Sequence, residues 1–416
     1  MSALSYLEKL LDGVDVQWKT IGEVISRTSN IKWREVTRSY RYVDLTSVDI
    51  ETKKITETTE IIANNAPSRA QKLLEENDVI FATTRPTQQR FCLIDSEYSG
   101  EVASTGYCVL RAKQDEVLPK WILHWISTSY FKKYVEENQS GSAYPAISDA
   151  RVKECLIPIP CPDNPEKSLA IQSEIVRILD TFTALTAELT AELSTRKKQY
   201  NYYRDQLLSF KDGEIEWKTL GDITKLITKG TTPKKFVDDG VNFIKLESFE
   251  NNRIKKDKFM FIPEVIHLKD LKRSILEAND ILFAIAGATI GKCAVVDETL
   301  LPANTNQALA IIRTSEMVNV RFVFYYMQTR AMKEYIAKFN KTSAQPNLNL
   351  NQMSNFKIPV PSIEEQLRIV SILDKFDALT SSISEGLPRE IELRQKQYEY
   401  YRDLLFSFPK PEVTTD

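Results

Sequence analysis

The sequence "KQYNYYRDQLLSF" (198–210) is repeated near the end of the chain as "KQYEYYRDLLFSF" (396–408), with ten of thirteen positions identical. Further pairs follow in the same order at offsets between 194 and 202 residues, among them "VQWKTIGEV" (16–24) with "IEWKTLGDI" (215–223) and "NDVIFA" (77–82) with "NDILFA" (279–284). A self-similarity that spans nearly the whole chain indicates an internal duplication. We therefore expect two structurally related halves.

Each half is predicted to contain a mixed globule followed by a long helix, so the expected fold class is α/β (α+β). The globules show short, β-like apolar runs bounded by turn residues. The helical stretches instead carry apolar residues every three or four positions, such as Ile175, Ile178 and Phe182. Because such a seam packs against another helix, we expect the two long helices to form an antiparallel coiled coil in a circular pseudo-twofold arrangement.

The same patterns place the domain boundaries. We predict an N-terminal helical stub (1–13), globule 1 (14–160), a central long helix (161–211), globule 2 (212–361), a C-terminal long helix (362–408) and a tail (409–416). The stub "SYLEKLLDG" resembles the helix end "YYRDQLLSFKDG", which would make the repeat circular and bring the two termini close together. The alternative is an amphipathic helix that packs on its own globule.

The two long helices differ at one place. The central helix contains the tandem "TAELTAEL" (186–193), whereas the C-terminal helix is four residues longer in the corresponding stretch and carries Gly386 and Pro388 there. Because proline is favoured at the start of a helix and glycine at its boundaries, we predict that the C-terminal helix breaks and restarts at this point.

Composition excludes several classes of protein. At 416 residues the chain is too long for one core, and with 42% hydrophobic and 27% charged residues it has the composition of a soluble protein. The N-terminus lacks the pattern of a signal peptide, no apolar run approaches ~18 residues, and the five cysteines form no CxxC pair. We expect a cytoplasmic protein with reduced thiols, no membrane association and no structural zinc.

Charge is unevenly distributed, although the net charge is only −2. Residues 218–357 carry 21 basic and 14 acidic side chains, whereas residues 161–217 and 362–416 are both acidic overall. A basic globule beside acidic helices suggests that the globules contact phosphate and that the helices contact protein.

No motif predicts catalysis on this chain. "GATIGKC" (287–293) is not a phosphate-binding loop, because Ala286 stands at the first glycine position and Cys293 replaces the Ser or Thr that holds magnesium. The sequence has no GxGxxG after a strand and no Asn-Pro-Pro-aromatic tetrapeptide. The two histidines, His124 and His267, lie in helical contexts typical of structural residues. We expect no active site, no metal and no cofactor on this chain.

Several polar loops carry side chains suited to DNA. Arginine pairs with guanine and glutamine with adenine in the major groove, while lysine and small polar groups contact phosphates. Corresponding loops are polar in both halves yet differ in sequence, which is expected if the two halves recognise different base sequences. A single polar loop is usually solvated surface, so the candidates are proposed as a set: Thr84, Arg85, Thr87, Gln88, Gln89, Arg90, Ser142, Tyr144, Lys229, Thr231, Thr232, Lys234, Lys235, Thr289, Lys292, Asn304, Asn306, Gln307, Lys341 and Thr342.

These features resemble the specificity (S) subunit of a Type I restriction–modification system, over essentially the full chain. The resemblance rests on the paired "KQYxYYRD" helix ends, the paired "IPxP" exits from the globules, and "GATIGK", "NTNQALAIIR" and "LNLNQMSNFKIPVP" in globule 2; the "TAEL" tandem is similar to the IC group. It implies a non-catalytic subunit that reads a bipartite, asymmetric double-stranded DNA target, with one half-site per globule. The half-sites would be separated by a spacer of unread base pairs, whose length is set by the helices. Globule 1 has "TTRPTQQR" where globule 2 has "AIAGATIGK", which leaves its base preference open.

The resemblance also implies partner subunits. These would be two methyltransferase (modification) subunits and, in the full complex, restriction motor subunits, and the partners rather than this chain would bind S-adenosylmethionine, ATP and Mg. Identical helix faces would dock the methyltransferases, and the candidate residues are Tyr202, Arg204, Asp205, Tyr400, Arg402 and Asp403. The alternative for these residues is ordinary solvated helix surface. The alternative functions are an assembly scaffold that reads no DNA and an unrecognised nuclease.

Overall fold

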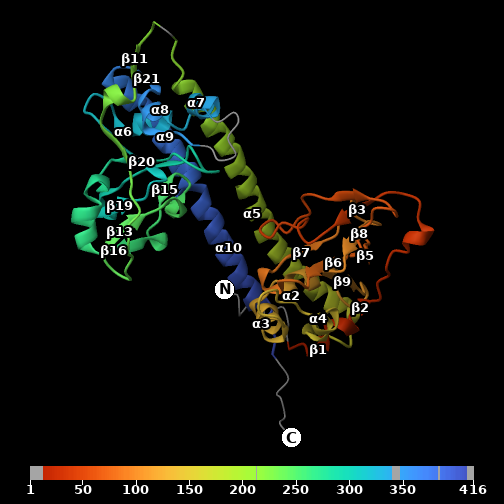
Figure 1. Ribbon diagram of the computed structural model, residues 1–416. Helices are drawn as coiled ribbons and strands as arrows, with labels where there is room; N and C mark the ends of the chain where they lie inside the picture. Colours follow the sequence, from red (N-terminus) through yellow and green to blue (C-terminus); the bar gives the residue numbers. More distant parts are fainter. Residues whose placement is uncertain (1–12, 212, 340–346, 383–384, 410–416) are drawn as a thin grey trace. The chain divides into compact units, whose positions relative to one another are not determined.

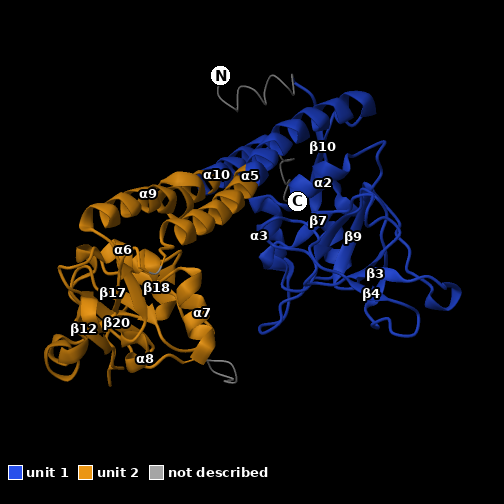
Figure 2. Ribbon diagram, turned by 90° about the horizontal axis from the view of Figure 1, so that it is seen from above, with its two compact units in different colours: residues 1–188, 392–416 blue, residues 189–391 orange. Residues whose placement is uncertain are grey.

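The computed structural model describes residues 13–211, 213–339, 347–382 and 385–409. The chain divides into two compact units, which comprise residues 1–188 with 392–416 (unit 1) and residues 189–391 (unit 2; Figure 2). Each unit therefore combines one globule with long-helix segments from both halves of the sequence. The mixed α/β fold class and the duplication are confirmed.

Unit 1 contains two four-stranded sheets with the orders β2-β9-β6-β7 and β4-β3-β8-β5. All pairings are antiparallel except that of β3 with β8. The strands are β2 (Ile25–Ser26), β3 (Tyr40–Val43), β4 (Thr59–Ile61), β5 (Ala70–Leu73), β6 (Val79–Ala82), β7 (Phe91–Leu93), β8 (Val102–Ser104) and β9 (Tyr107–Ala112) (Figure 1).

The two faces of strand β6 belong to different cores. Val79 and Phe81 pack with the helices of the unit, whereas Ile80 and Ala82 pack with residues of the second sheet. Because both faces are covered, the strand is a continuous apolar run instead of an alternating one.

Three short helices cover the first core of unit 1, namely α2 (Pro119–Ile126), α3 (Ser129–Asn138) and α4 (Asp149–Glu154). The side chains of Thr128 and Ser148 accept backbone hydrogen bonds at the starts of α3 and α4, which satisfies donors that a helix leaves free. A two-stranded ladder of β1 (Val16–Thr20) and β10 (Leu156–Pro160) then leads into the long helix.

Unit 2 repeats this plan. Its main sheet has the order β12-β20-β17-β18, beside a three-stranded sheet β16-β13-β19 in which β13 and β19 are parallel, and beside the hairpin β14-β15. The strands are β11 (Glu216–Thr219), β12 (Thr224–Lys229), β13 (Val241–Ile244), β14 (Phe249–Glu250), β15 (Arg253–Ile254), β16 (Met260–Ile262), β17 (Ile281–Ala284), β18 (Cys293–Val295), β19 (Ala303–Thr305), β20 (Leu309–Thr314) and β21 (Lys357–Val360). The helices are α6 (Val320–Tyr326), α7 (Arg330–Phe339) and α8 (Leu350–Ser354), and β11 pairs with β21.

One buried ion pair is present at the same place in both globules. The carboxylate of Asp78 is fully buried and contacts Arg111 at 2.8 Å, and that of Asp280 is fully buried and contacts Arg313 at 2.8 Å. Each carboxylate also accepts a backbone hydrogen bond from the turn before the central strand. The pair therefore joins that turn to the neighbouring strand in each globule.

The long helices are α5 (Pro165–Leu207), α9 (Ile363–Ser381) and α10 (Gly386–Leu405). The predicted break in the C-terminal helix is confirmed, since α9 ends at Ser381 and α10 begins at Gly386. Gly386 has φ +79°, and a Cβ there would lie 2.5 Å from the carbonyl oxygen of Ala378, so the position requires glycine. The stub 1–13, apart from Gly13, and the tail beyond Pro409 lie outside the described residues.

Each globule is completed by the end of the long helix from the other half. In unit 1, Phe406 of the C-terminal segment packs on Trp121 of α2, with ring centroids 4.6 Å apart, and Tyr401 stacks on Phe182 of α5 at 5.4 Å. In unit 2, Tyr203 of α5 stacks on Phe376 of α9 at 5.8 Å. In both units the late part of one long helix meets the early part of the other, which is the antiparallel, circular pairing that the repeat predicted.

None of the helices in the described part of the chain has the length and apolar character needed to cross a membrane.

Candidate nucleic-acid interface

In globule 1, the two loops that were singled out as DNA candidates lie side by side. The backbone N–H of Arg85 donates to the carbonyl of Pro145 at 2.7 Å, and that of Ile147 donates to the carbonyl of Thr83 at 2.9 Å. Thr84 and Ala146 form an isolated β-bridge between the loops. No sequence motif predicts that residues about 60 positions apart share one edge of the globule.

The exposed tip of this loop pair carries an arginine and a tyrosine. Arg85 is exposed, and its guanidinium carbon lies 5.3 Å from the ring centroid of Tyr144, which is 71% exposed. Arg85 and Gln89 both have positive φ, +50° and +53°, at the two ends of a short 3-10 turn. Gln88 and Ser142 are exposed beside this pair, whereas Thr84 and Thr87 are half-buried. The arrangement presents planar polar and aromatic groups to solvent.

Two positions in the same loop do not fit the role predicted for them. Arg90 donates through Nη1 to the carbonyl oxygens of Leu45 and Val48, so its guanidinium holds two loops together instead of facing outward. Gln89 has its amide nitrogen buried and without a hydrogen-bond partner among the described residues. We therefore assign Arg90 to the frame of the loop and remove it from the reading surface.

Lys53, which no sequence motif marks as a candidate, is a neighbour of this loop. Its ammonium group donates to the carbonyl of Gln89 and lies 4.5 Å from the ring centroid of Phe91. Burial lowers the pKa of Lys53 to about 8. Lys53 has φ +55°, a loop conformation that no sequence motif announced.

Globule 2 uses the same backbone frame for different side chains. The backbone N–H of Leu348 donates to the carbonyl of Ile285 at 2.8 Å, and Ala286 forms a β-bridge with Asn347. These contacts correspond to the Ile147–Thr83 and Thr84–Ala146 contacts of globule 1. Within the frame, Thr289 is half-buried and Lys292 is exposed. The candidates Lys341 and Thr342 lie outside the described residues.

A second pair of loops in globule 2 meets at Gly230. The backbone N–H of Thr231 donates to the carbonyl of Thr305 at 3.0 Å, and the Thr232 hydroxyl donates to the amide oxygen of Gln307. A Cβ at Gly230 would lie 2.1 Å from the Thr305 carbonyl oxygen, so only glycine allows this approach. Exposed lysines flank the turn: Lys229, Lys234 and Lys235.

Asn304 is the other candidate that the structure removes from the surface. It is fully buried, its amide oxygen faces Nδ1 of His267 at 2.5 Å, and its amide nitrogen donates to the carbonyl of Leu271 at 3.1 Å. These contacts satisfy the side chain inside the protein. Asn306 is half-buried and accepts a hydrogen bond from the backbone of Ala308.

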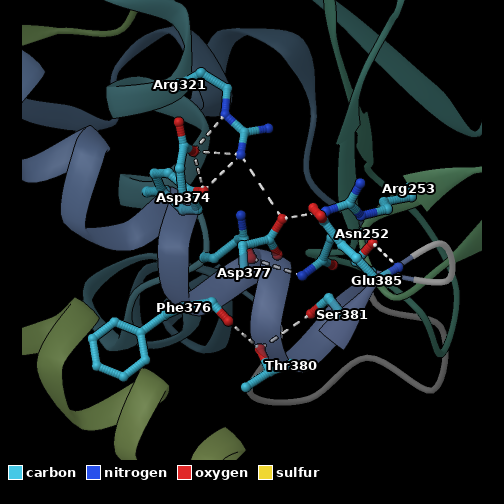
Figure 3. A network of polar contacts seen from close by, with 12 residues as sticks. Asn252, Arg253, Arg321, Asp374, Phe376, Asp377, Thr380, Ser381 and Glu385 are labelled. Carbon is cyan, nitrogen blue, oxygen red and sulfur yellow. Dashed lines mark hydrogen bonds and ion pairs between the residues drawn. The ribbon is translucent and has the colours of Figure 1, made fainter. Parts of the chain in front are cut away.

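A polar network joins globule 2 to its long helix (Figure 3). Asp377 of α9 is 5% exposed and contacts Arg253 of β15 at 3.0 Å and Arg321 of α6 at 3.8 Å. Arg321 also contacts Asp374, one helical turn earlier, at 2.6 Å. Asn252, at the hairpin tip, donates to the side chain of Gln328. The hairpin, the short helix α6 and the long helix α9 are therefore held in one arrangement.

Unit 1 has a simpler joint at the equivalent place. Asp180 of α5 contacts Lys120 at 2.6 Å and Nε2 of His124 at 3.0 Å. Although burial alone would raise it, hydrogen bonds from His124 and Lys120 hold the pKa of Asp180 below its usual value. Nδ1 of His124 lies 2.9 Å from the Tyr398 hydroxyl of α10. His124 therefore links globule 1 to both long-helix segments.

The predicted partner-docking residues divide into exposed and buried positions. Tyr202 and Tyr400 are 64% and 65% exposed. Arg204 and Arg402 are instead only 4% and 7% exposed, and each is paired with the following aspartate, Asp205 at 2.9 Å or Asp403 at 2.8 Å. The arginines are therefore not available as exposed docking residues, because their charges are satisfied beside the globules.

Four of the five cysteines, Cys92, Cys108, Cys155 and Cys293, are buried, and Cys161 is half-buried. Burial raises the pKa of Cys92, Cys108 and Cys293 to about 12 in each case, so these groups remain protonated thiols. Among the residues that the structure describes, no cluster of histidine, cysteine and carboxylate side chains could hold a metal ion.

Comparison with known proteins identifies the class to which this fold and these loops belong. The family model described as "Type I restriction modification DNA specificity domain" matches twice, at residues 14–196 and 213–393. The specificity subunit of the type I restriction enzyme EcoR124I/EcoR124II from Escherichia coli is 40% identical over the full length of both chains. The EcoprrI specificity subunit, also from Escherichia coli, is 34% identical, with 92% of this chain and 93% of that protein covered. The chain therefore belongs to the family of type I restriction–modification DNA specificity subunits.

Solved structures show the same fold at low sequence identity. A chain from a study of "complex assembly and conformational transition of the type I R-M system" matches with a TM-score of 0.63 and 22% identity over 94% of this chain and 97% of that chain. The S subunit of the type I restriction–modification system from M. genitalium matches with a TM-score of 0.52 and 15% identity over 96% and 98% of the two chains.

Proposed function

We propose that each globule reads one half of a bipartite, asymmetric DNA target. One observation carries the proposal: the two globules place their paired loops with the same backbone contacts, Ile147–Thr83 and Leu348–Ile285, but carry different side chains there. A shared frame with different tips is what two half-sites of different sequence require.

The exposed side chains suit that role. A guanidinium such as that of Arg85 can pair bidentately with guanine, and the amide of Gln88 can pair with adenine. Tyr144, beside Arg85, offers a planar ring and a hydroxyl at the same edge. In globule 2 the exposed groups are lysines and small polar residues, which favour contacts with DNA phosphates. Fewer side chains are then left to contact bases than in globule 1.

The long helices set the spacer and dock two methyltransferase subunits in this proposal, with restriction motor subunits in the full complex. The repeated exposed tyrosines, Tyr202 and Tyr400, are the surface that the chain presents twice. S-adenosylmethionine, ATP and Mg are bound by the partners, and this chain is non-catalytic. The names of the relatives, which are specificity subunits of type I restriction enzymes, support this division of labour.

Gel-shift titrations of the full chain, with and without its methyltransferase partner, test the proposal. We expect sequence-specific binding to a target-bearing duplex and much weaker binding to a scrambled duplex. Equal affinity for both duplexes in the presence of the partner would favour an assembly scaffold that reads no DNA. Cleavage of the duplex by the chain alone would favour a nuclease instead.

A further inference from the structure

A cavity of about 330 Å³ lies in unit 2 where the long helix, the β14-β15 hairpin and the loop before β18 meet. Four elements line it. Helix α5 contributes Lys197, Tyr200 and Asn201, the hairpin contributes Phe249, Asn251 and Asn252, the loop contributes Lys292, and the end of α9 contributes Thr380 and Ser381. Figure 3 draws three of these residues, Asn252, Thr380 and Ser381, as sticks.

The lining of the cavity is positively charged. Lys197 and Lys292 reach it from different elements, and no aspartate or glutamate is among its lining residues. The ion pairs found among the described residues include neither lysine, whereas Arg253 and Lys255 of the hairpin are paired, with Asp377 at 3.0 Å and with Glu250. Two lysines in one lining that contains no carboxylate favour an anionic ligand.

The two asparagines of the hairpin hold fixed positions beside the cavity. Asn251 and Asn252 have φ +48° and +60° and form the two-residue turn between the paired residues Glu250 and Arg253, which is the geometry of a type I′ hairpin. Asn252 is fixed further by its hydrogen bond to Gln328 at 2.8 Å. The Thr380 hydroxyl already donates to the carbonyl of Phe376. The amide groups of Asn201 and Asn251 and the ammonium groups of the two lysines are the donors that can meet the oxygens of a phosphate group.

We propose that this cavity binds one backbone phosphate of the DNA beside the half-site that globule 2 reads; this rests on the proposed function above. Lys292 lies at the end of the loop that carries the proposed base-reading tip of globule 2. We therefore favour a DNA phosphate over a free phosphate ion as the ligand. A phosphate held there would also contact α5 through Lys197. The DNA would then be gripped jointly by the reading globule and by the helix that sets the spacer.

The size of the effect follows from counterion release. The affinity of a protein for B-form DNA falls with salt with a slope of about −0.9 per phosphate contact, so one contact contributes about eightfold at 0.1 M salt relative to 1 M. Replacement of Lys197 should therefore weaken binding by about that factor at 0.1 M salt and reduce the salt slope by about 1. The loss should be equal for target and non-target DNA, because a phosphate carries no sequence information.

The chain offers a matched control one residue away. Lys198 is exposed and does not line the cavity, so Lys198→Gln removes the same charge from the same helix turn. We would measure the salt dependence of DNA binding for the full chain with its methyltransferase partner, as wild type, Lys197→Gln, Lys198→Gln and Lys292→Gln. Equal salt slopes for Lys197→Gln and Lys198→Gln would overturn the proposal.

Neutral phosphate analogues locate the contact. We would replace one phosphate linkage of the duplex at a time by an uncharged methylphosphonate. At a single position, Lys197→Gln should then cause no further loss of DNA affinity, because the ion pair between Lys197 and the phosphate is already absent there. Additive losses at every linkage would overturn the proposal.

Two further outcomes separate the possible failures. In the first, millimolar inorganic phosphate binds the cavity instead of DNA. If Lys197→Gln abolishes this phosphate binding but leaves the salt slope of DNA binding unchanged, the cavity binds a free anion and the proposal is overturned. A negative result for the cavity would not affect the proposal that the chain reads a bipartite target. Absence of any sequence preference in the wild type would instead refute the proposed function itself.

Discussion

Insertion of one further "TAEL" after residue 193 should lengthen the DNA spacer by one base pair and leave both half-sites unchanged. The boundary between the two compact units lies between Glu188 and Leu189, inside the existing tandem, so the added turn disturbs no globule. Helix α5 is continuous from Pro165 to Leu207, and the insert extends a regular helix.

The magnitude follows from the geometry of the two helices. Four residues add ~6 Å and turn the end of the helix by ~40° beyond a full turn. One base pair adds ~3.4 Å and ~35°, and two add ~7 Å and ~70°. One pair leaves ~2.6 Å of axial misfit and ~5° of rotational misfit, whereas two pairs leave ~1 Å and ~30°. We expect rotation to decide, because a small tilt of a globule recovers length while a phase error turns its loops out of the groove.

Sequencing of methylated adenines in a host that carries the insertion variant and its partners would measure the spacer directly. A variant with Thr186→Ala and Thr190→Ala, which keeps the helix length, serves as the control and should keep the wild-type spacer. An unchanged spacer in the insertion variant, or altered half-site bases, would refute the idea that α5 acts as a ruler. A spacer longer by two pairs would show that length outweighs rotation.

Three other predictions concern the units themselves. Asp78→Ala and Asp280→Ala should each destabilise only its own unit by about 3 kcal/mol, because each removes the buried partner of Arg111 or Arg313 and leaves only a carboxylate that is more than half exposed, Glu75 or Glu277; urea unfolding followed by hydrogen exchange would show it, and equal losses in both units would contradict it. Asp377→Asn should cost unit 2 about 1 kcal/mol, since its partner Arg253 is 43% exposed, without changing the target bases; a changed half-site would instead make Asp377 part of the reading surface. The pKa of Lys53 is about 8 in the fold against 10.5 for an ordinary lysine, so the penalty for burying its charge is full below pH 8 and disappears towards pH 10.5. Stability should therefore rise with pH over that range in the wild type more than in Lys53→Met, and parallel pH profiles of the urea midpoints would refute this.

The sequence predicted the elements that local pattern controls. The long helices follow from the three-to-four-residue period, and the break before α10 follows from Gly386, whose positive φ only glycine adopts easily. The pairing of long-helix ends with opposite halves followed from the circular repeat. The buried Asp78 and Asp280 could also have been found, because each stands in the repeated phrase "ND(V/I)(I/L)FA" directly before a buried strand.

The roles of individual polar residues could not be predicted in the same way. Arg90 and Asn304 were selected for their chemistry, but their partners, the carbonyls of Leu45 and Leu271, are distant in sequence and decide that both side chains point inward. The cavity near Lys197 is formed by four segments that only the fold brings together. Tertiary contacts therefore determine which polar side chains remain free for DNA.

Mapping of methylated adenines for Arg85→Ala would show whether each globule reads its own half-site. We expect relaxed or weakened recognition, by about 1–3 kcal/mol, at bases of one half-site only, with the other half-site and the spacer unchanged. Arg90→Ala is the control in the same loop and should lower the stability of unit 1 without altering base preference. Equal loss at both half-sites for Arg85→Ala would contradict the account.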